Sequence, residues 1–163
     1  MRKLLLTIAW MAGVALFASC GTTASAQRSE KASELAAKVK DALTEQNFKI
    51  EVNFMTPLKG MARSVTTDHY LQVNGETLFS YLPYAGDAFN IPYGGGQGLN
   101  FTESIDSYKL TQKKSDEFVV EIGVKNSEDT YVFTITVFDN GRASIDVRGR
   151  QRDPISFNGE MRF

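Results

Sequence analysis

The sequence has few of the residues that build metal centres, disulfide frameworks and histidine-based catalysis. Its 163 residues include one Cys, one His and one Trp. A single Cys cannot form an internal disulfide framework or a Cys-rich zinc site. A single His leaves no paired-histidine zinc pattern and no histidine relay. We therefore expect this protein to hold no metal and no cofactor.

An excess of charge of one sign is also missing. The chain has 18 basic and 19 acidic residues, which gives a net charge of −1. Proteins whose main partner is nucleic acid usually carry a strongly basic surface. We therefore expect no nucleic acid as a partner. A length of 163 residues predicts a single domain.

The one long apolar run lies at the N-terminus, over residues 4–18, and follows the basic residues Arg2 and Lys3. The run is too short for a comfortable membrane span, and small residues come after it. This order is typical of an export signal. We predict that residues 1–26 are a signal segment and tether, and that residues 27–163 form one α+β domain. Without residues 1–26, the net charge becomes −3.

Two processing routes fit the signal segment. Residues 24–26, Ala-Ser-Ala, match the A-x-A pattern, with cleavage before Gln27. Residues 17–20, Phe-Ala-Ser-Cys, resemble the lipobox of bacterial lipoproteins, in which Cys20 would be acylated and become the new N-terminus. Either route predicts export to the Gram-negative periplasm. The second adds attachment to a membrane through the lipid anchor.

The rest of the sequence predicts one helix followed by strands. Apolar residues at helical spacing predict an amphipathic helix over residues 29–45, with Ser29 as its N-cap. From residue 47 the apolar residues alternate, and Asn74-Gly75 predicts a type I′ hairpin turn. We count about eight strands. Residues 106–112 form the weakest of them, and residues 131–138 read as a central strand with both faces covered. The predicted fold is α+β, with the helix packed on a curved, mainly antiparallel sheet.

Residues 81–101 differ from the rest, because they combine aromatic residues with Gly and Pro. One interpretation is a ligand groove with stacking walls and a closely approaching glycine backbone. The candidate ligand-binding residues are Tyr81, Tyr84, Phe89, Tyr93, Gly94 and Gly95. The alternative is an Ω-like loop whose aromatic side chains plug one end of the sheet. The glycine run lacks the Lys-Ser/Thr of a phosphate-binding loop.

The same stretch resembles the signature of a bacterial family known as domain of unknown function 4251. The matching residues are Tyr81-Leu82-Pro83-Tyr84, Gly86, Ala88-Phe89, Pro92-Tyr93-Gly94-Gly95, Gly98 and Phe101. Residues 141–143 and 155–159 are similar as well. The resemblance implies one domain in a secreted or lipid-anchored envelope protein. It implies no activity and no catalytic residue.

No motif in the sequence carries a recognisable reaction. His69 has Asp68 beside it, but neighbours in a strand point to opposite faces, and there is no G-x-S-x-G elbow. Glu103 and Asp106 are candidate carboxylates. Arg148, Arg150 and Arg152 form a basic cluster that would suit an anionic ligand or a solvated strand edge.

Three functions remain open. The first is a non-enzymatic envelope module that binds a protein, lipid or glycan through residues 81–101. The second is a hydrolase of envelope or glycan substrates that uses two carboxylates near that segment. The third is a structural or inhibitory protein that uses a face of the sheet, which a large exposed apolar patch would indicate. We expect the first.

Overall fold

The computed structural model describes residues 22–66, 68–89 and 98–163. Residues 1–21 of the predicted signal segment, with Cys20, lie outside the described residues, whereas residues 22–26 form the start of α1. By its internal contacts the chain divides into two units, Met1–Glu34 and Leu35–Phe163. The helix α1 (Thr22–Thr44) runs through this boundary. Within the described residues, no helix has a stretch long and apolar enough to cross a membrane.

The predicted helix begins earlier than expected. It starts at Thr22, so Ser29 lies within it and the prediction of Ser29 as the N-cap is wrong. No Gly or Pro occurs between residues 22 and 28, and therefore nothing there opposes helix formation. We predicted the start of the helix from the first apolar residues at helical spacing. A backbone can be helical without such residues, so the helix extends further toward the N-terminus.

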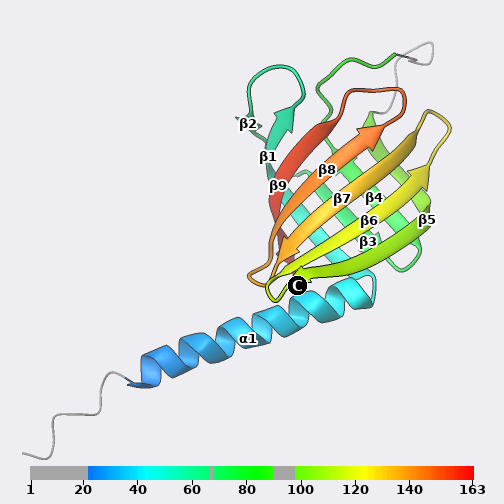
Figure 1. The fold of residues 1–163 in the computed structure, drawn as a ribbon. Coiled ribbons are helices and arrows are strands. Elements are labelled where there is room, and N and C mark those ends of the chain that lie inside the picture. Colours follow the sequence, from blue (N-terminus) through cyan, green and yellow to red (C-terminus); the bar gives the residue numbers. More distant parts are fainter. Residues whose placement is uncertain (1–21, 67, 90–97) are drawn as a thin grey trace, which may run out of the picture. The chain divides into compact units, whose positions relative to one another are not determined.

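The nine strands of the described residues belong to one antiparallel sheet, drawn in Figure 1. They are β1 (Asn47–Pro57), β2 (Arg63–Ser64), β3 (Tyr70–Asn74), β4 (Thr77–Leu82), β5 (Leu99–Lys114), β6 (Glu117–Lys125), β7 (Thr130–Phe138), β8 (Arg142–Gly149) and β9 (Ile155–Arg162). Strands β6 to β9 form the antiparallel meander predicted from the sequence. The prediction of α+β with an antiparallel sheet is confirmed.

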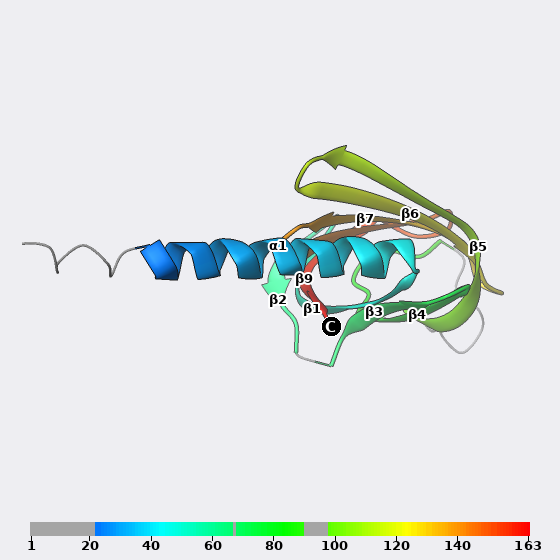
Figure 2. The ribbon, with the colours of Figure 1, turned by 90° about the horizontal axis from the view of Figure 1, so that it is seen from below.

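The sheet closes on itself. Strand β1 pairs with β3 along one edge and with β9 along the other, so β1 and β3 to β9 form a barrel of eight strands. The short strand β2 adds to β1 at Phe54 and Met55. Figure 2 shows the barrel from below. A curved sheet is thus correct but incomplete, because closure pairs the first strand with the last.

Apolar side chains fill the barrel. In an eight-stranded barrel the interior is just wide enough for side chains to occupy it. Tyr131, Phe133 and Phe157 are the largest of the fully buried side chains. From α1, Val39 and Leu43 belong to the same buried cluster. The C-terminal part of α1 therefore covers one end of the barrel.

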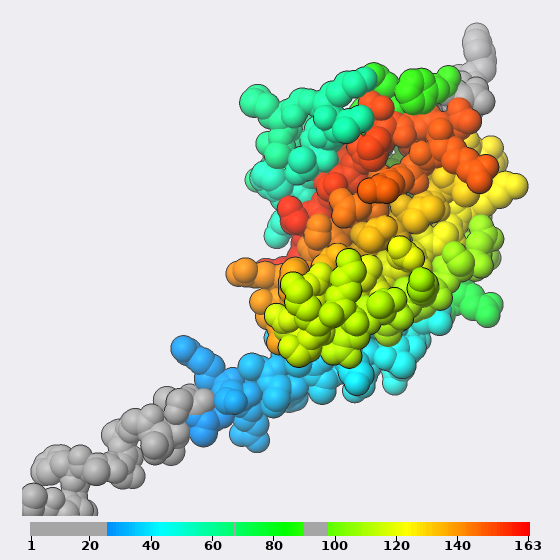
Figure 3. Space-filling view, viewed as in Figure 1, coloured from blue at the N-terminus to red at the C-terminus, as the bar shows by residue number. Residues whose placement is uncertain are grey.

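Two strands, β7 and β5, differ from what the sequence predicted. β7 was expected to be covered on both faces, but its burial alternates, and Val132 on its outer face is 45% exposed. β5 was expected to be the weakest strand and is the longest. Its pairing register shifts between Ile105 and Ser107, and this irregularity interrupts the alternation that identifies a strand. Figure 3 shows that β6 to β9 present a continuous outer surface.

The hairpin between β3 and β4 is present with a different turn. Asn74 pairs with Thr77, so Gly75 and Glu76 are the two central residues. Among the described residues, Gly75 has a positive φ of 57° and Glu76 does not. A type I′ turn needs positive φ at both central positions, whereas type II′ needs it only at the first. The I′ prediction is therefore wrong, and the observed φ signs match type II′.

Candidate binding surface

The structure separates the candidate residues of the segment 81–101. Tyr81 belongs to β4, and Tyr84 and Phe89 lie in the connection from β4 to β5. The other three candidates, Tyr93, Gly94 and Gly95, lie outside the described residues. The aromatic residues that can be placed do not line one groove, because Tyr81 and Tyr84 have different neighbours.

Tyr84 is folded inward at one end of the barrel. Its hydroxyl donates a hydrogen bond to the carbonyl oxygen of Asp87 at 2.9 Å and lies 3.2 Å from that of Asp153. Its ring lies over the guanidinium of Arg152, at 5.3 Å from the ring centroid. Burial raises the pKa of the Tyr84 hydroxyl. Tyr84 thus fits the second interpretation of the segment, an aromatic side chain that closes the end of the sheet.

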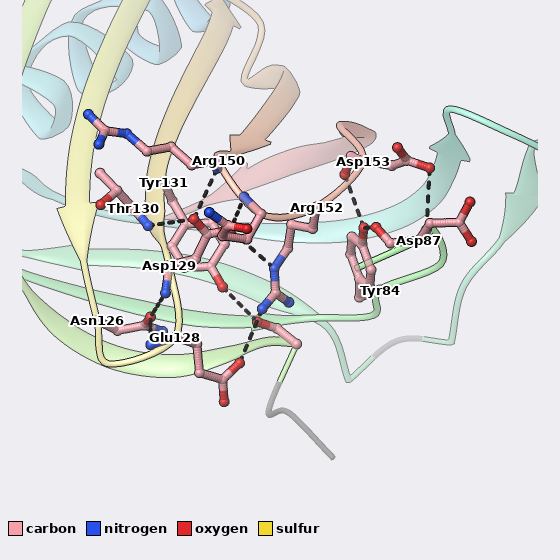
Figure 4. Close-up of polar contacts among 12 residues, drawn as sticks. Tyr84, Asp87, Asn126, Glu128, Asp129, Thr130, Tyr131, Arg150, Arg152 and Asp153 are labelled. Atoms are coloured by element: carbon pink, nitrogen blue, oxygen red, sulfur yellow. Dashed lines mark hydrogen bonds and ion pairs between the residues drawn. The ribbon is translucent and has the colours of Figure 1, made fainter. Parts of the chain in front are cut away.

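Arg152 is the centre of this closed end, which Figure 4 shows in detail. Its side chain is 6% exposed and lies between the rings of Tyr84 and Tyr131, at 5.3 and 5.4 Å. Its guanidinium forms ion pairs with Glu128 at 3.1 Å and with Asp129 at 3.4 Å. The buried charge is therefore balanced by two carboxylates and flanked by two ring faces.

Asp129 joins two connections of the barrel. Its carboxylate accepts hydrogen bonds from the backbone N–H groups of Thr130, Arg150 and Gln151, at 2.7 to 3.0 Å. These bonds tie the turn before β7 to the connection between β8 and β9. With the Arg152 ion pair added, the oxygens of Asp129 are occupied. This carboxylate therefore holds the two connections together.

The predicted arginine cluster is divided. Arg152 is buried, whereas Arg148 and Arg150 are exposed. Strand β8 ends at Gly149, so the alternation that would place all three side chains on one face stops before Arg152. The buried ion pairs and the three backbone bonds to Asp129 were missed by sequence reasoning, because they join turns more than 20 residues apart.

A second arrangement lies on the outer face of the barrel, on strands β3, β4 and β5. Tyr70 pairs with Tyr81, which pairs with Asn100. One row along, Gln72 pairs with Phe79, which pairs with Thr102. Directly paired residues lie on the same face of an antiparallel sheet. We call these six residues the aromatic face: Tyr70, Gln72, Phe79, Tyr81, Asn100 and Thr102.

The aromatic face is hollowed. A depression of about 280 Å³ lies over β3, β4 and β5, and its lining includes the rings of Tyr70, Phe79 and Tyr81. Asn100 and Thr102 supply an amide and a hydroxyl at its β5 side. None of the six residues of the face is charged. Aromatic rings beside a few neutral polar groups are typical of small-molecule sites.

Two neighbours hold the tyrosines of this face. The imidazole of His69 stacks on the ring of Tyr81, with centroids 5.3 Å apart, and the Tyr70 ring lies 5.9 Å from that of Tyr81. On the β1 side, the ammonium of Lys49 lies 4.4 Å from the Tyr70 centroid. Tyr81 nevertheless remains 45% exposed. Its ring is therefore both held in place and accessible.

His69 does not belong to a relay among the described residues. Its Nδ1 is buried and has no hydrogen-bond partner there. The base of a Ser-His-Asp set is oriented by a carboxylate bonded to that nitrogen, and no such bond is present in the described part of the chain. His69 is half-buried, as the sequence predicted, but it directly precedes β3 and does not belong to a strand.

The other candidate catalytic and metal-binding side chains do not form a site in the described residues. Glu103 is half-buried and Asp106 is exposed, both on β5. No set of three or more His, Cys, Asp or Glu side chains in residues 22–66, 68–89 and 98–163 is arranged to hold a metal ion. Large exposed apolar side chains occur elsewhere, on Leu58, Met61, Phe89, Val132, Phe138 and Phe163.

The family follows from a comparison with known proteins. The profile of the family described as domain of unknown function 4251 matches residues 30–161. The chain belongs to this family. A solved DUF4251 family protein from Bacteroides eggerthii is 17% identical and has a TM-score of 0.60. The match covers 78% of this chain and 87% of that one.

At that identity, the similarity to the Bacteroides eggerthii protein concerns the fold alone. A search of curated proteins finds no match. The resemblance inferred from residues 81–101 is therefore confirmed at the level of the family. DUF4251 carries no assigned function, and the function of this chain has to be argued from its own residues.

Sequence reasoning named Tyr81 but missed the rest of the aromatic face. The predicted Asn74-Gly75 turn did not reveal it. With these two as the central residues, Tyr70 would pair with Phe79, whereas in the structure the turn lies one residue later and Tyr70 pairs with Tyr81. The pairing of Asn100 and Thr102 with this hairpin could not be predicted from the sequence either, because the long connection between β4 and β5 does not determine the register of β5.

Proposed function

We propose that this DUF4251 protein is a non-enzymatic binding module of the cell envelope and that its ligand contacts the aromatic face. The observation that carries the proposal is Tyr81, which is 45% exposed, stacked on His69 and part of a depression lined by Tyr70 and Phe79. An accessible aromatic ring in a depression beside further rings and neutral polar groups is typical of a ligand site.

The location rests on the sequence. A basic n-region, an apolar run and small residues predict export of the chain, and Cys20 offers a site for a lipid anchor. In this proposal the barrel is held at the envelope through an acylated Cys20 or, after cleavage before Gln27, released into the periplasm. The aromatic face then meets the polymers, lipids and proteins of that compartment.

Binding is favoured over catalysis by the pairing of two acidic residues at the closed end of the barrel. Glu128 and Asp129 are both paired with Arg152, and Asp129 also accepts three backbone hydrogen bonds. A glycoside hydrolase needs two carboxylates that face a cleft, one of them able to donate a proton. The hollowed aromatic face has no carboxylate among its residues.

Co-sedimentation of the purified protein with envelope material tests the proposal. The probes are peptidoglycan sacculi, phospholipid vesicles and immobilised envelope polysaccharide. We expect binding to one of them, lost in Tyr81→Ser and retained in Val132→Ser. Val132 is a matched control, because it is also 45% exposed and lies on an outer strand face. Thermal unfolding of both variants confirms that they are folded.

Two results would overturn the proposal. One is binding to none of the three probes. The other is binding that Tyr81→Ser and Val132→Ser reduce equally, since that would place the contact elsewhere on the barrel.

A further inference from the structure

We infer that the ligand of the aromatic face is a neutral carbohydrate. The inference rests on the proposed function and adds the chemical class of the ligand. The argument uses the composition of the face, the size of its depression and the polar groups at its edge.

The composition of the face excludes strongly charged ligands. Its rings belong to Tyr70, Phe79 and Tyr81, and its polar groups are amides and a hydroxyl without formal charge. The charges that adjoin the face are on β1, where Lys49 pairs with Gln72 and Glu51 with Tyr70, and these two side chains form an ion pair at 4.0 Å. A strongly charged ligand would have to compete with that ion pair for a partner, which is unfavourable when water is displaced.

The polar edge excludes a purely apolar ligand. Asn100 and Thr102 lie beside the rings on β5, and Gln72 lies on β3. An acyl chain in the depression would displace water from an amide and a hydroxyl without replacing their hydrogen bonds, at a cost for each group. A ligand that suits this face must offer apolar surface to the rings and hydrogen-bonding groups to the edge.

A sugar ring meets both requirements. The C–H groups on one face of a pyranose pack against an aromatic ring, while its hydroxyls donate and accept hydrogen bonds around the rim. Asn100 offers an amide oxygen and an amide NH₂, and Thr102 offers a hydroxyl. The three rings, of which Tyr81 is exposed and the other two are half-buried, lie on strands next to these polar groups, so one ligand can reach both sets.

The size of the depression agrees with this ligand class. Its volume of about 280 Å³ lies just below the range for sites of drug-sized ligands, roughly 300–1,000 Å³. A stable protein interface needs about 20–30 residues on each side, whereas the aromatic face has six. The site therefore suits one or two units of a polysaccharide better than the surface of a folded protein.

Nuclear magnetic resonance titration of the purified protein tests the inference. The probes are neutral oligosaccharides (gluco-, manno- and galacto-oligosaccharides), with oligogalacturonate as the acidic counterpart. We expect a neutral oligosaccharide to shift the amide signals of Phe79, Tyr81 and Asn100. We also expect Tyr81→Ala and Asn100→Ala each to weaken binding about tenfold or more. Val132→Ala, on the far strand β7, should bind as the wild type does.

The outcomes of the titration distinguish the carbohydrate assignment from the proposed binding function of the aromatic face. Tyr81-dependent binding to lipid vesicles or to oligogalacturonate, without binding to a neutral sugar, would overturn the carbohydrate assignment and leave the proposed function standing. Binding of a neutral sugar with unchanged affinity in both Tyr81→Ala and Asn100→Ala would overturn both. Unshifted circular dichroism spectra for the two variants ensure that a loss of binding is not a loss of fold.

Discussion

The imidazole of His69 and the phenol ring of Tyr81 are stacked, with centroids 5.3 Å apart and planes inclined by 29°. His69 precedes β3 directly, and Tyr81 lies near the end of β4, so the contact spans the open end of the hairpin. The stack limits the rotamers available to the exposed ring of Tyr81. A ring that is ordered before binding loses less conformational entropy when a ligand packs against it.

Removal of the His69 ring is therefore expected to weaken binding without unfolding the barrel. We predict that His69→Ala lowers affinity severalfold and changes the melting temperature little, while His69→Phe restores most of the affinity by restoring a stacking partner. The measurement is the affinity of both variants for the probe that binds the wild type. Equal affinity of His69→Ala and the wild type would show that the stack has no positioning role.

Arg152 is expected to be one of the most destabilising positions to change. Arg152→Met leaves Glu128 and Asp129 without their cation at a buried site, and loss of one partner of a buried ion pair costs about 3–5 kcal/mol. Arg150→Met is the matched control. Its side chain is exposed, and only its backbone N–H contacts Asp129.

Urea unfolding of the two arginine variants measures this difference. A free energy of unfolding for Arg152→Met within about 0.5 kcal/mol of that for Arg150→Met would contradict the structural role of the network. Arg152→Lys is not expected to rescue stability. An ammonium lacks the flat guanidinium that lies between two rings and pairs with two carboxylates.

Closure of the barrel places a strict requirement on Gly159. A Cβ atom added there would overlap the backbone carbonyl oxygen of Glu51 on the paired strand β1. We predict that Gly159→Ala destabilises the protein by about 1–3 kcal/mol, because the strands would have to separate. Asn158→Ala, at the exposed neighbouring position, serves as the control. Equal melting temperatures for the two variants would contradict the close approach of β1 and β9.

Alkaline pH is expected to destabilise the fold through Tyr108. Burial raises the pKa of its hydroxyl to about 12, and the hydroxyl donates to the Leu43 carbonyl oxygen at 2.7 Å. An unfolded tyrosine ionises near pH 10. The folded state therefore retains a proton that the unfolded state loses, so stability is complete below pH 10 and declines between about pH 10 and 12.

Urea unfolding of the wild type and Tyr108→Phe at pH 8 and pH 11 tests this linkage. The variant should be less stable at pH 8, because the hydrogen bond to Leu43 is lost at a cost of about 0.5–1.5 kcal/mol. It should also lose less stability than the wild type between the two pH values. An identical loss in both proteins would show that Tyr108 does not titrate as described. Burial also raises the pKa of Tyr131 to about 12. Tyr131 is therefore expected to cause the part of the stability loss that remains in Tyr108→Phe.

The strands that could be predicted from the sequence are those with uninterrupted alternation. β6, β8 and β9 place apolar residues inward at every second position, and a local pattern is sufficient to identify them. β5 escaped this test because the register shifts after Ile105, which breaks the period of two. β7 was misjudged because threonine and valine favour strands on either face.

Neither the closure of the barrel by β1 and β9 nor the Arg152 network at its closed end could be predicted from local sequence patterns. Glu51 and Arg162 form an ion pair across the seam of β1 and β9, 111 residues apart in sequence. No local pattern records a contact of that range. The Arg152 network has the same character, since its partners come from a different turn. The aromatic face was missed for a different reason. With Asn74 and Gly75 as the central turn residues, Tyr70 would face Phe79, whereas the observed turn pairs Tyr70 with Tyr81.

The central claim is that ligand binds on the outer face of β3, β4 and β5 and not at the closed end of the barrel. Chemical-shift mapping with the envelope probe that co-sediments with the protein tests this most directly. We predict that the largest shifts fall on Tyr70, Phe79, Tyr81 and Asn100. Shifts concentrated on Tyr84, Phe89 and Arg152, with the aromatic face unchanged, would contradict the account.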